Sequence, residues 1–94
     1  MKFEVELAEK ADRDLRNIFF YIAVDLSAPE NAERQINRLW DAILSLDELP
    51  ERYRRYEDEP WYSRGMRVLP IDNFVILYIP YLEEKVVRIV TVMY

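Results

Sequence analysis

The chain is short and acidic, with 94 residues, a formal net charge of -5 and 51% hydrophobic residues, which suits a single cytoplasmic domain with one modest core. It has no Cys and no His, so disulfides, thiolate metal sites and the commonest general base are excluded, and we expect no cofactor and no bound metal. The acidic balance also argues against a nucleic-acid binder, whose phosphate contacts normally need a basic excess.

The N-terminal segment predicts a strand followed by a helix. Residues 3–7 alternate apolar and acidic side chains with period two, which indicates a strand with one solvated face. Residues 8–26 change to the helical period. The apolar positions expected on the buried face of this helix are Ala11, Leu15, Ile18, Phe19, Ile22 and Leu26.

Three further apolar residues of this helix, Phe20, Tyr21 and Val24, lie outside the buried stripe. Two interpretations follow. The helix is either sandwiched between the sheet and a second helix, or it presents these residues to a protein partner, because exposed aromatic patches often mark interfaces.

Ser27 is the predicted N-cap of a second helix. Ser27 and Glu30 have the spacing of a capping box, and Pro29 is tolerated in a first helical turn. The apolar stripe that follows includes Trp40, which we expect in the core, and the helix should end before Pro50. Because the connection between the two helices is so short, they are expected to pack as an antiparallel hairpin.

Residues 51–63 are polar, aromatic and aperiodic, which predicts a loop. Their interleaved Arg and Tyr residues could form a platform for single-stranded RNA. Carboxylates flank these arginines, however, and favour a solvated loop whose charges pair with one another. Trp61, beside Pro60, would either plug the end of the sheet or serve as an anchor for a partner.

The last third of the chain predicts three strands, over residues 66–69, 74–79 and 85–93, separated by turns at 71–73 and 80–84. The longest apolar run, 74–79, is far too short to span a membrane. Residues 1–94 therefore predict one α+β domain, in which an N-terminal strand and an antiparallel helical hairpin precede a three-stranded antiparallel meander. We expect an antiparallel sheet backed by the hairpin.

This element order, with four local strings, resembles the RelE/ParE superfamily of bacterial toxins. The strings are AEKADRDL at 8–15, WYSRGMR at 61–67, NFVILY at 73–78 and EKVVRIV at 84–90. They resemble the entry to the family's first helix and the approach to, or body of, its last three strands. The resemblance implies a toxin of a type II toxin–antitoxin pair, held in check by a cognate antitoxin through which it could also oligomerise.

The resemblance implies one of two targets, because the family divides mainly into ribosome-dependent mRNA endonucleases and inhibitors of DNA gyrase. The endonucleases typically carry an Arg three residues before a Tyr on the third strand, and counting back from Tyr78 this position is Val75. They also use Arg, His or Tyr just beyond the fourth strand, where this chain ends at Tyr94. An endonuclease reading would assign Arg67 and Arg88 to phosphate charge and Tyr94 to proton transfer; the alternative is that both arginines form surface ion pairs.

The sequence therefore favours a ParE-like toxin that binds DNA gyrase, is not an enzyme, and contacts its antitoxin through Phe20, Tyr21, Val24 and Trp61. The alternatives are a RelE-like endonuclease acting on mRNA at the ribosome, an inactive toxin truncated at Tyr94, and a small α+β adaptor without toxic activity. None of these interpretations involves a membrane.

Overall fold

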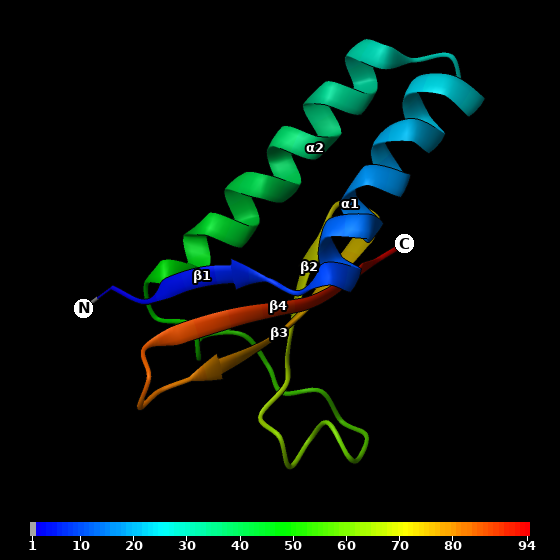
Figure 1. Ribbon diagram of the computed structural model, residues 1–94. Coiled ribbons are helices and arrows are strands. Elements are labelled where there is room, and N and C mark those ends of the chain that lie inside the picture. Colours follow the sequence, from blue (N-terminus) through cyan, green and yellow to red (C-terminus); the bar gives the residue numbers. More distant parts are fainter. Residues whose placement is uncertain (1) are drawn as a thin grey trace.

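The computed structural model describes residues 2–94 and has the predicted α+β element order (Figure 1). The elements are β1 (Glu4–Leu7), α1 (Glu9–Phe20), the π-helix η1 (Tyr21–Asp25), α2 (Pro29–Leu44), the 3-10 turn η2 (Ser45–Asp47), β2 (Arg67–Ile71), β3 (Phe74–Tyr81) and β4 (Val86–Met93). The N-terminal strand, the helical hairpin and the C-terminal meander are thus confirmed.

The four strands form one sheet in the order β1-β4-β3-β2. The meander of β2, β3 and β4 is antiparallel, as predicted. The expectation that the whole sheet is antiparallel is wrong, because β1 pairs with β4 in parallel. A parallel neighbour needs a long crossover connection, and the hairpin with its following loop supplies one. Period-two alternation identifies the two faces of a strand and says nothing about the direction of its neighbour.

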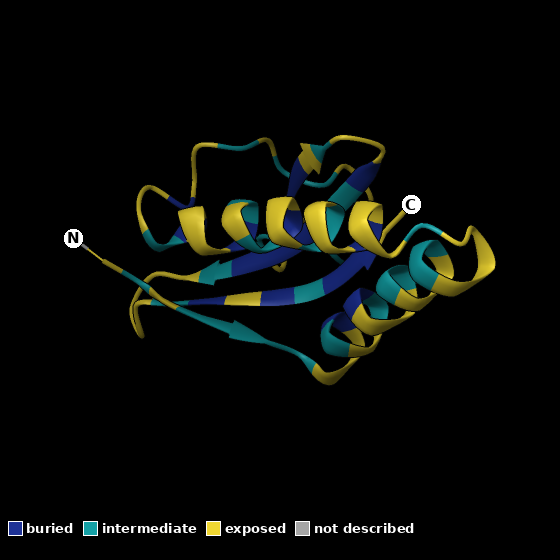
Figure 2. Cartoon of the chain, turned by 90° about the horizontal axis from the view of Figure 1, so that it is seen from above, coloured by how far each residue is buried: buried dark blue, intermediate teal, exposed yellow. Residues whose placement is uncertain are grey.

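The helices cover one face of the sheet and bury the larger of two hydrophobic clusters (Figure 2). Its fully buried side chains include Leu39, Ile43, Ile76, Tyr78 and Ile89. A smaller cluster of Met66, Val68, Leu77 and Ile79 lies on the opposite face of β2 and β3, packed against Tyr56 and Trp61. Trp40, expected in the core, is half-buried and packs at its border.

The turn between the helices differs from the prediction. Ser27 has a φ of 52° and Ala28 is the N-cap of α2, without a side-chain hydrogen bond, so the capping box is wrong. The chain needs a left-handed residue to leave η1, which removes Ser27 from the capping position. Pro29 does lie in the first turn of α2, as expected, and is its first residue. Leu26, assigned to the buried face, is exposed because it ends η1 at the tip of the hairpin.

Candidate functional site

The tip of the helical hairpin carries an exposed apolar patch, defined here as the tip patch of Phe20, Tyr21 and Val24. Their exposed fractions are 59%, 55% and 65%. The tip projects beyond the sheet (Figure 1), and although η1 packs there against α2, these three side chains stay exposed. These three residues are therefore not sandwiched between the sheet and the second helix, which was the first of the two interpretations of the sequence.

A groove opens on one side of the tip patch, between the helical hairpin and the edge of the sheet where β3 begins and β4 ends. It has a volume of about 570 Å³, and its lining residues are Asn17, Ile18, Tyr21, Ile22, Leu26, Gln35, Asn73, Phe74 and Tyr94. The lining is mostly apolar, and its polar side-chain groups are the amides of Asn17, Gln35 and Asn73 and the hydroxyls of Tyr21 and Tyr94, a composition typical of a protein-binding groove.

Tyr94 belongs to this groove. Its side chain is highly exposed, at 89% for the residue, and its ring packs edge-on against Phe74 with centroids 5.5 Å apart. A second, smaller groove of about 400 Å³ lies on the other side of α1, where Phe19 and Phe20 face Ile36 and Trp40 of α2. The tip patch therefore connects two apolar grooves.

Trp61, predicted to be a partner anchor, lies away from the tip patch. It packs against the cluster on the sheet face opposite the helices and is half-buried there. The guanidinium of Arg64 lies 5.1 Å from the centre of its ring. The structure therefore brings Phe20, Tyr21 and Val24 together and does not bring Trp61 to them.

Arg67 lies on the face of β2 that the helices cover, directly opposite Tyr78 of β3. Its Nη1 donates to the main-chain oxygens of Tyr53 at 2.7 Å and Glu51 at 3.1 Å. Its Nη2 also lies 3.5 Å from the Glu51 carboxylate, and the Arg67 side chain is only 18% exposed. These contacts tie the start of the loop to the sheet.

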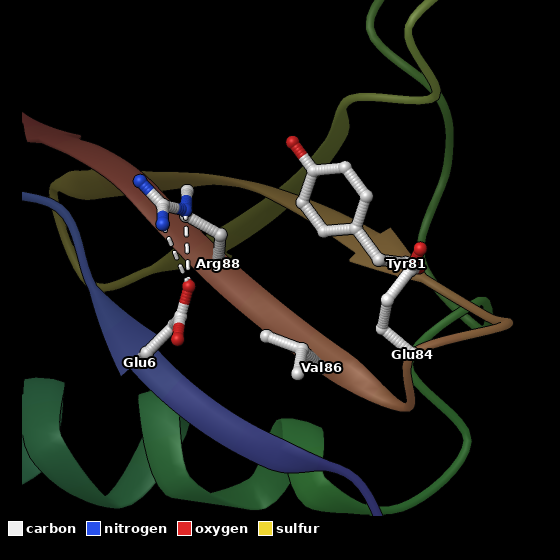
Figure 3. A pocket seen from close by; sticks show the side chains of 5 residues that line it. All are labelled: Glu6, Tyr81, Glu84, Val86 and Arg88. Atoms are coloured by element: carbon white, nitrogen blue, oxygen red, sulfur yellow. Dashed lines mark hydrogen bonds and ion pairs between the residues drawn. The ribbon is translucent and has the colours of Figure 1, made fainter.

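Arg88 lies on the opposite face of the sheet. The register aligns Arg67 with Tyr78 and Tyr78 with Ile89, so Arg88, one residue before Ile89, points the other way. Its guanidinium is 2.8 Å from the Glu6 carboxylate, beside a shallow pocket that Tyr81 and Glu84 also line (Figure 3). Arg67, Arg88 and Tyr94 therefore lie at three separate places.

Two polar groups, Tyr78 and Asp14, link distant segments inside the domain, a role that the sequence did not predict for either. The Tyr78 hydroxyl donates to the Pro50 carbonyl at 2.7 Å, and burial raises the pKa of Tyr78 to about 12. The Asp14 carboxylate accepts hydrogen bonds from Thr91 Oγ1 at 2.5 Å and Val92 N at 3.0 Å. Neither link is visible as a spacing pattern, because the partners are far apart in the sequence.

The arginines of the loop are largely engaged within the domain. Arg52 donates to the main-chain oxygens of Ser45 and Leu49 and stacks over the Tyr53 ring. Arg55 donates to the Tyr62 carbonyl, and its guanidinium carbon lies 4.2 Å from the centre of the Tyr62 ring. The loop therefore pairs its charges internally, mainly with carbonyls and rings. Within residues 2–94, no cluster of three or more acidic side chains could hold a metal ion.

The profile of the ParE toxin of the type II toxin–antitoxin system parDE matches residues 5–94. The chain belongs to the ParE toxin family. No curated protein sequence matches this toxin.

Solved toxin–antitoxin structures share the fold of this ParE-family toxin. The chromosomal ParDE system from P. aeruginosa matches with a TM-score of 0.80 at 20% identity, over 98% of this chain and 95% of that one. The RelBE2 complex from Mycobacterium tuberculosis matches with a TM-score of 0.75 at 19% identity, over 100% and 99%. The intact E. coli RelBE complex matches with 0.55 at 13% identity, over 97% and 94%.

Two further features of this ParE-family toxin concern Val75 and the helices. Val75, at the position where the endonucleases typically carry Arg, is half-buried on β3. It lines a hollow with Val68 and Leu77, whose rim carries the charged side chains of Arg54, Glu57 and Asp58. None of the helices within residues 2–94 is long and apolar enough to cross a membrane.

Proposed function

We propose that this chain is a ParE-type toxin that inhibits DNA gyrase by binding it and that a cognate antitoxin neutralises it. The observation that carries this proposal is the separation of Arg67 from Arg88. Cleavage of a phosphodiester requires several groups aimed at one phosphate. Arg67 is engaged by main-chain oxygens on one face of the sheet, and Arg88 is paired with Glu6 on the other.

The charge of the molecule supports the same choice. The net charge is -5, and Val75 places an apolar side chain where the endonucleases carry a cation. A toxin that acts on RNA would gain little from phosphate attraction with this composition. A toxin that acts by protein–protein binding has no need of a basic surface.

The tip patch and its two grooves are the surface that we assign to the antitoxin. The patch exposes three large apolar side chains at a projecting position, a property common in interface anchors. The solved relatives are toxin–antitoxin complexes, which supports an antitoxin as the partner. Trp61, half-buried on the other face, is a second contact only if the antitoxin also wraps around the sheet.

The target can be tested with the purified chain in two assays run side by side. We expect it to inhibit gyrase-catalysed DNA supercoiling, to lose this effect when the antitoxin is added, and to leave ribosome-bound mRNA intact. Cleavage of that mRNA, abolished by Arg67→Ala or Arg88→Ala, would overturn the gyrase assignment in favour of the endonuclease. Inactivity in both assays would count against any toxic function.

The antitoxin surface is tested by the double substitution Phe20→Ser/Val24→Ser. Because both side chains are exposed, thermal stability should change little, whereas antitoxin affinity should fall at least about tenfold, as expected for interface anchors. Leu82→Ser is the matched control, since Leu82 is an exposed apolar residue in the β3–β4 turn. Equal affinities of the two variants would show that the tip patch is not the antitoxin surface.

A further inference from the structure

Leu49 has a backbone conformation that a leucine rarely takes. Its φ is 47°, and the other residues with positive φ within residues 2–94 are Ser27, Gly65, Asp72 and Lys85. The left-handed region is unfavourable for a bulky side chain. Leu49 is also followed by a proline, and the residue before a proline normally has a negative φ. Two conformational preferences are therefore opposed at this one position.

Hydrogen bonds hold the turn at Leu49 in place. The main-chain N and the Nη1 of Arg52 both donate to the Leu49 carbonyl at 3.1 Å. The Nη2 of Arg52 donates to the Ser45 carbonyl at 3.2 Å. On the inner side of the turn, the Tyr78 hydroxyl donates to the Pro50 carbonyl at 2.7 Å. The surrounding structure therefore imposes the left-handed conformation on Leu49.

Packing does not offset this strain, because Leu49 is 75% exposed. Of the large apolar residues within residues 2–94, only Tyr94 is more exposed. A turn that needed nothing more than a left-handed residue would be better served by glycine or asparagine, which adopt this conformation readily and expose no hydrocarbon. Backbone strain that the surroundings impose on an exposed apolar residue is typical of a functional position.

Leu49 lies far from the tip patch. The helix α2 has 16 residues, which gives a length of about 24 Å, and it leads away from the tip to η2 and then to Leu49 (Figure 1). Leu44, the last residue of α2, is also exposed. Neither leucine lines a groove beside the tip patch. An antitoxin seated on the tip patch therefore leaves Leu49 to another partner.

The chain around Leu49 is acidic. Residues 41–51 contain no Lys or Arg, and their carboxylates are those of Asp41, Asp47, Glu48 and Glu51. Lys2 and Arg67 approach three of these carboxylates, at 3.3 to 3.7 Å. Arg52, next along the chain, directs both of its Nη atoms to main-chain oxygens. An excess of carboxylate remains at the turn. A second copy would bring the same carboxylates together, which opposes self-association here.

We propose that Leu49 is an anchor for gyrase, inserted into an apolar pocket whose rim carries Lys or Arg side chains. An enzyme that binds DNA must present cations to the phosphates, and a cationic rim complements the acidic turn. A side chain on a rigid turn loses little conformational entropy on binding, which gives the strain at Leu49 a use. This assignment rests on the proposed function and adds to it the part of the toxin that contacts the target.

The test is Leu49→Asn, which removes the hydrocarbon and relieves the strain, because asparagine tolerates the left-handed region. The melting temperature should rise by about 2 to 5 °C. The concentration that half-inhibits gyrase supercoiling should rise at least about tenfold, as expected for an anchor. A strained functional residue predicts both changes together. A fall in the melting temperature would instead show that Leu49 stabilises the fold by packing, and would overturn the proposal.

Leu82→Asn is the matched control. Leu82 is 48% exposed in the β3–β4 turn and is not among the residues with positive φ. This variant should inhibit gyrase as the native chain does and should gain no stability. Equal loss of inhibition in the two variants would show a general effect of removing surface hydrocarbon, and would exclude Leu49 as an anchor.

The same assays separate this proposal from the proposed function. A native chain that does not inhibit gyrase refutes the proposed function, and the anchor with it. A native chain that inhibits gyrase, with Leu49→Asn equally potent, overturns the anchor alone. Antitoxin affinity and sedimentation complete the set. If Leu49→Asn weakens antitoxin binding or a dimer while gyrase inhibition stays intact, the side chain serves the antitoxin or a second copy, and the proposal fails.

The cationic rim has its own test. Glu48→Lys should raise the concentration that half-inhibits gyrase about three- to tenfold, because it places a cation beside the proposed cations. Glu33→Lys, the same charge change at an exposed position of α2, is the matched control and should have little effect. Equal effects of the two lysine variants would show a net-charge effect and would overturn the assignment of a cationic rim.

Discussion

At the scale of single residues, Tyr78 shows how a polar group is used inside the core. The residue is fully buried, and its hydroxyl donates to the Pro50 carbonyl at 2.7 Å. Burial raises the pKa of Tyr78 from 10.0 to about 12, so the hydroxyl stays protonated at neutral pH. Its role is to tie β3 to the start of the loop.

Tyr78→Phe should lower the free energy of unfolding by about 1 to 2 kcal/mol, because the Pro50 carbonyl loses its buried donor. The measurement is equilibrium unfolding in urea at pH 7. Tyr21→Phe, which removes a hydroxyl from an exposed ring, should change stability by less than about 0.5 kcal/mol. A Tyr78 variant as stable as the Tyr21 variant would contradict this role.

The raised pKa of Tyr78 also predicts a loss of stability in alkali. The folded state holds the proton more tightly than the unfolded state, so the contribution is complete below about pH 10 and is lost as pH rises through about 12. The full effect is roughly 2 to 3 kcal/mol. The free energies of unfolding of the native chain and of the Tyr78→Phe variant should converge over this pH range. A constant difference between them would show that Tyr78 does not cause the loss of stability in alkali.

At the scale of elements, a single carboxylate joins α1 to the end of β4. Burial alone would raise the pKa of Asp14, but hydrogen bonds from Thr91 and Val92, together with Lys10, outweigh burial and hold the pKa below its usual value. Asp14 thereby anchors the irregular end of the last strand to the helix that leads to the tip patch.

Asp14→Asn should cost about 1 to 3 kcal/mol at pH 7, because an amide cannot accept all of these hydrogen bonds. Since the pKa of Asp14 is lowered on folding, its contribution is present above the unfolded pKa and disappears as pH falls through the folded value. The variant should therefore lose less stability in acid than the native chain. Asp12→Asn, which breaks only a surface pair with Arg16, should cost less than about 0.5 kcal/mol; a similar cost for both would contradict the anchoring role.

At the scale of the whole molecule, charge separates the two candidate targets. With a net charge of -5 and several arginines bound to carbonyls or carboxylates, the domain offers few free cations to phosphates. We expect little affinity for single-stranded RNA, and the logarithm of the association constant should change little with the logarithm of the salt concentration, with a slope near zero. Fluorescence anisotropy with labelled poly-U across a salt series measures this slope. A slope of about -2 or steeper would indicate several phosphate contacts and contradict the prediction.

The order of elements was determined by the sequence, because it depends on local information. Period-two alternation in β1 and helical periodicity in α1 and α2 are properties of a few neighbouring residues. Pro29 could be placed in the first turn of α2 for the same reason. The tip patch was also visible, since Phe20, Tyr21 and Val24 could be seen to lie outside the buried stripe.

Only the tertiary structure decided how these elements meet. That β4 enters between β1 and β3, parallel to β1, depends on pairing between residues more than eighty positions apart, which no local pattern encodes. The same register sends Arg67 and Arg88 to opposite faces and places Tyr94 beside Phe74. Alternation assigns side chains to the two faces of one strand. Strand order, direction and register determine which side chains of different strands lie on the same face of the sheet. For that reason the residues could be nominated from the sequence, but their separation, and the left-handed turn at Leu49, could be found only in the folded domain.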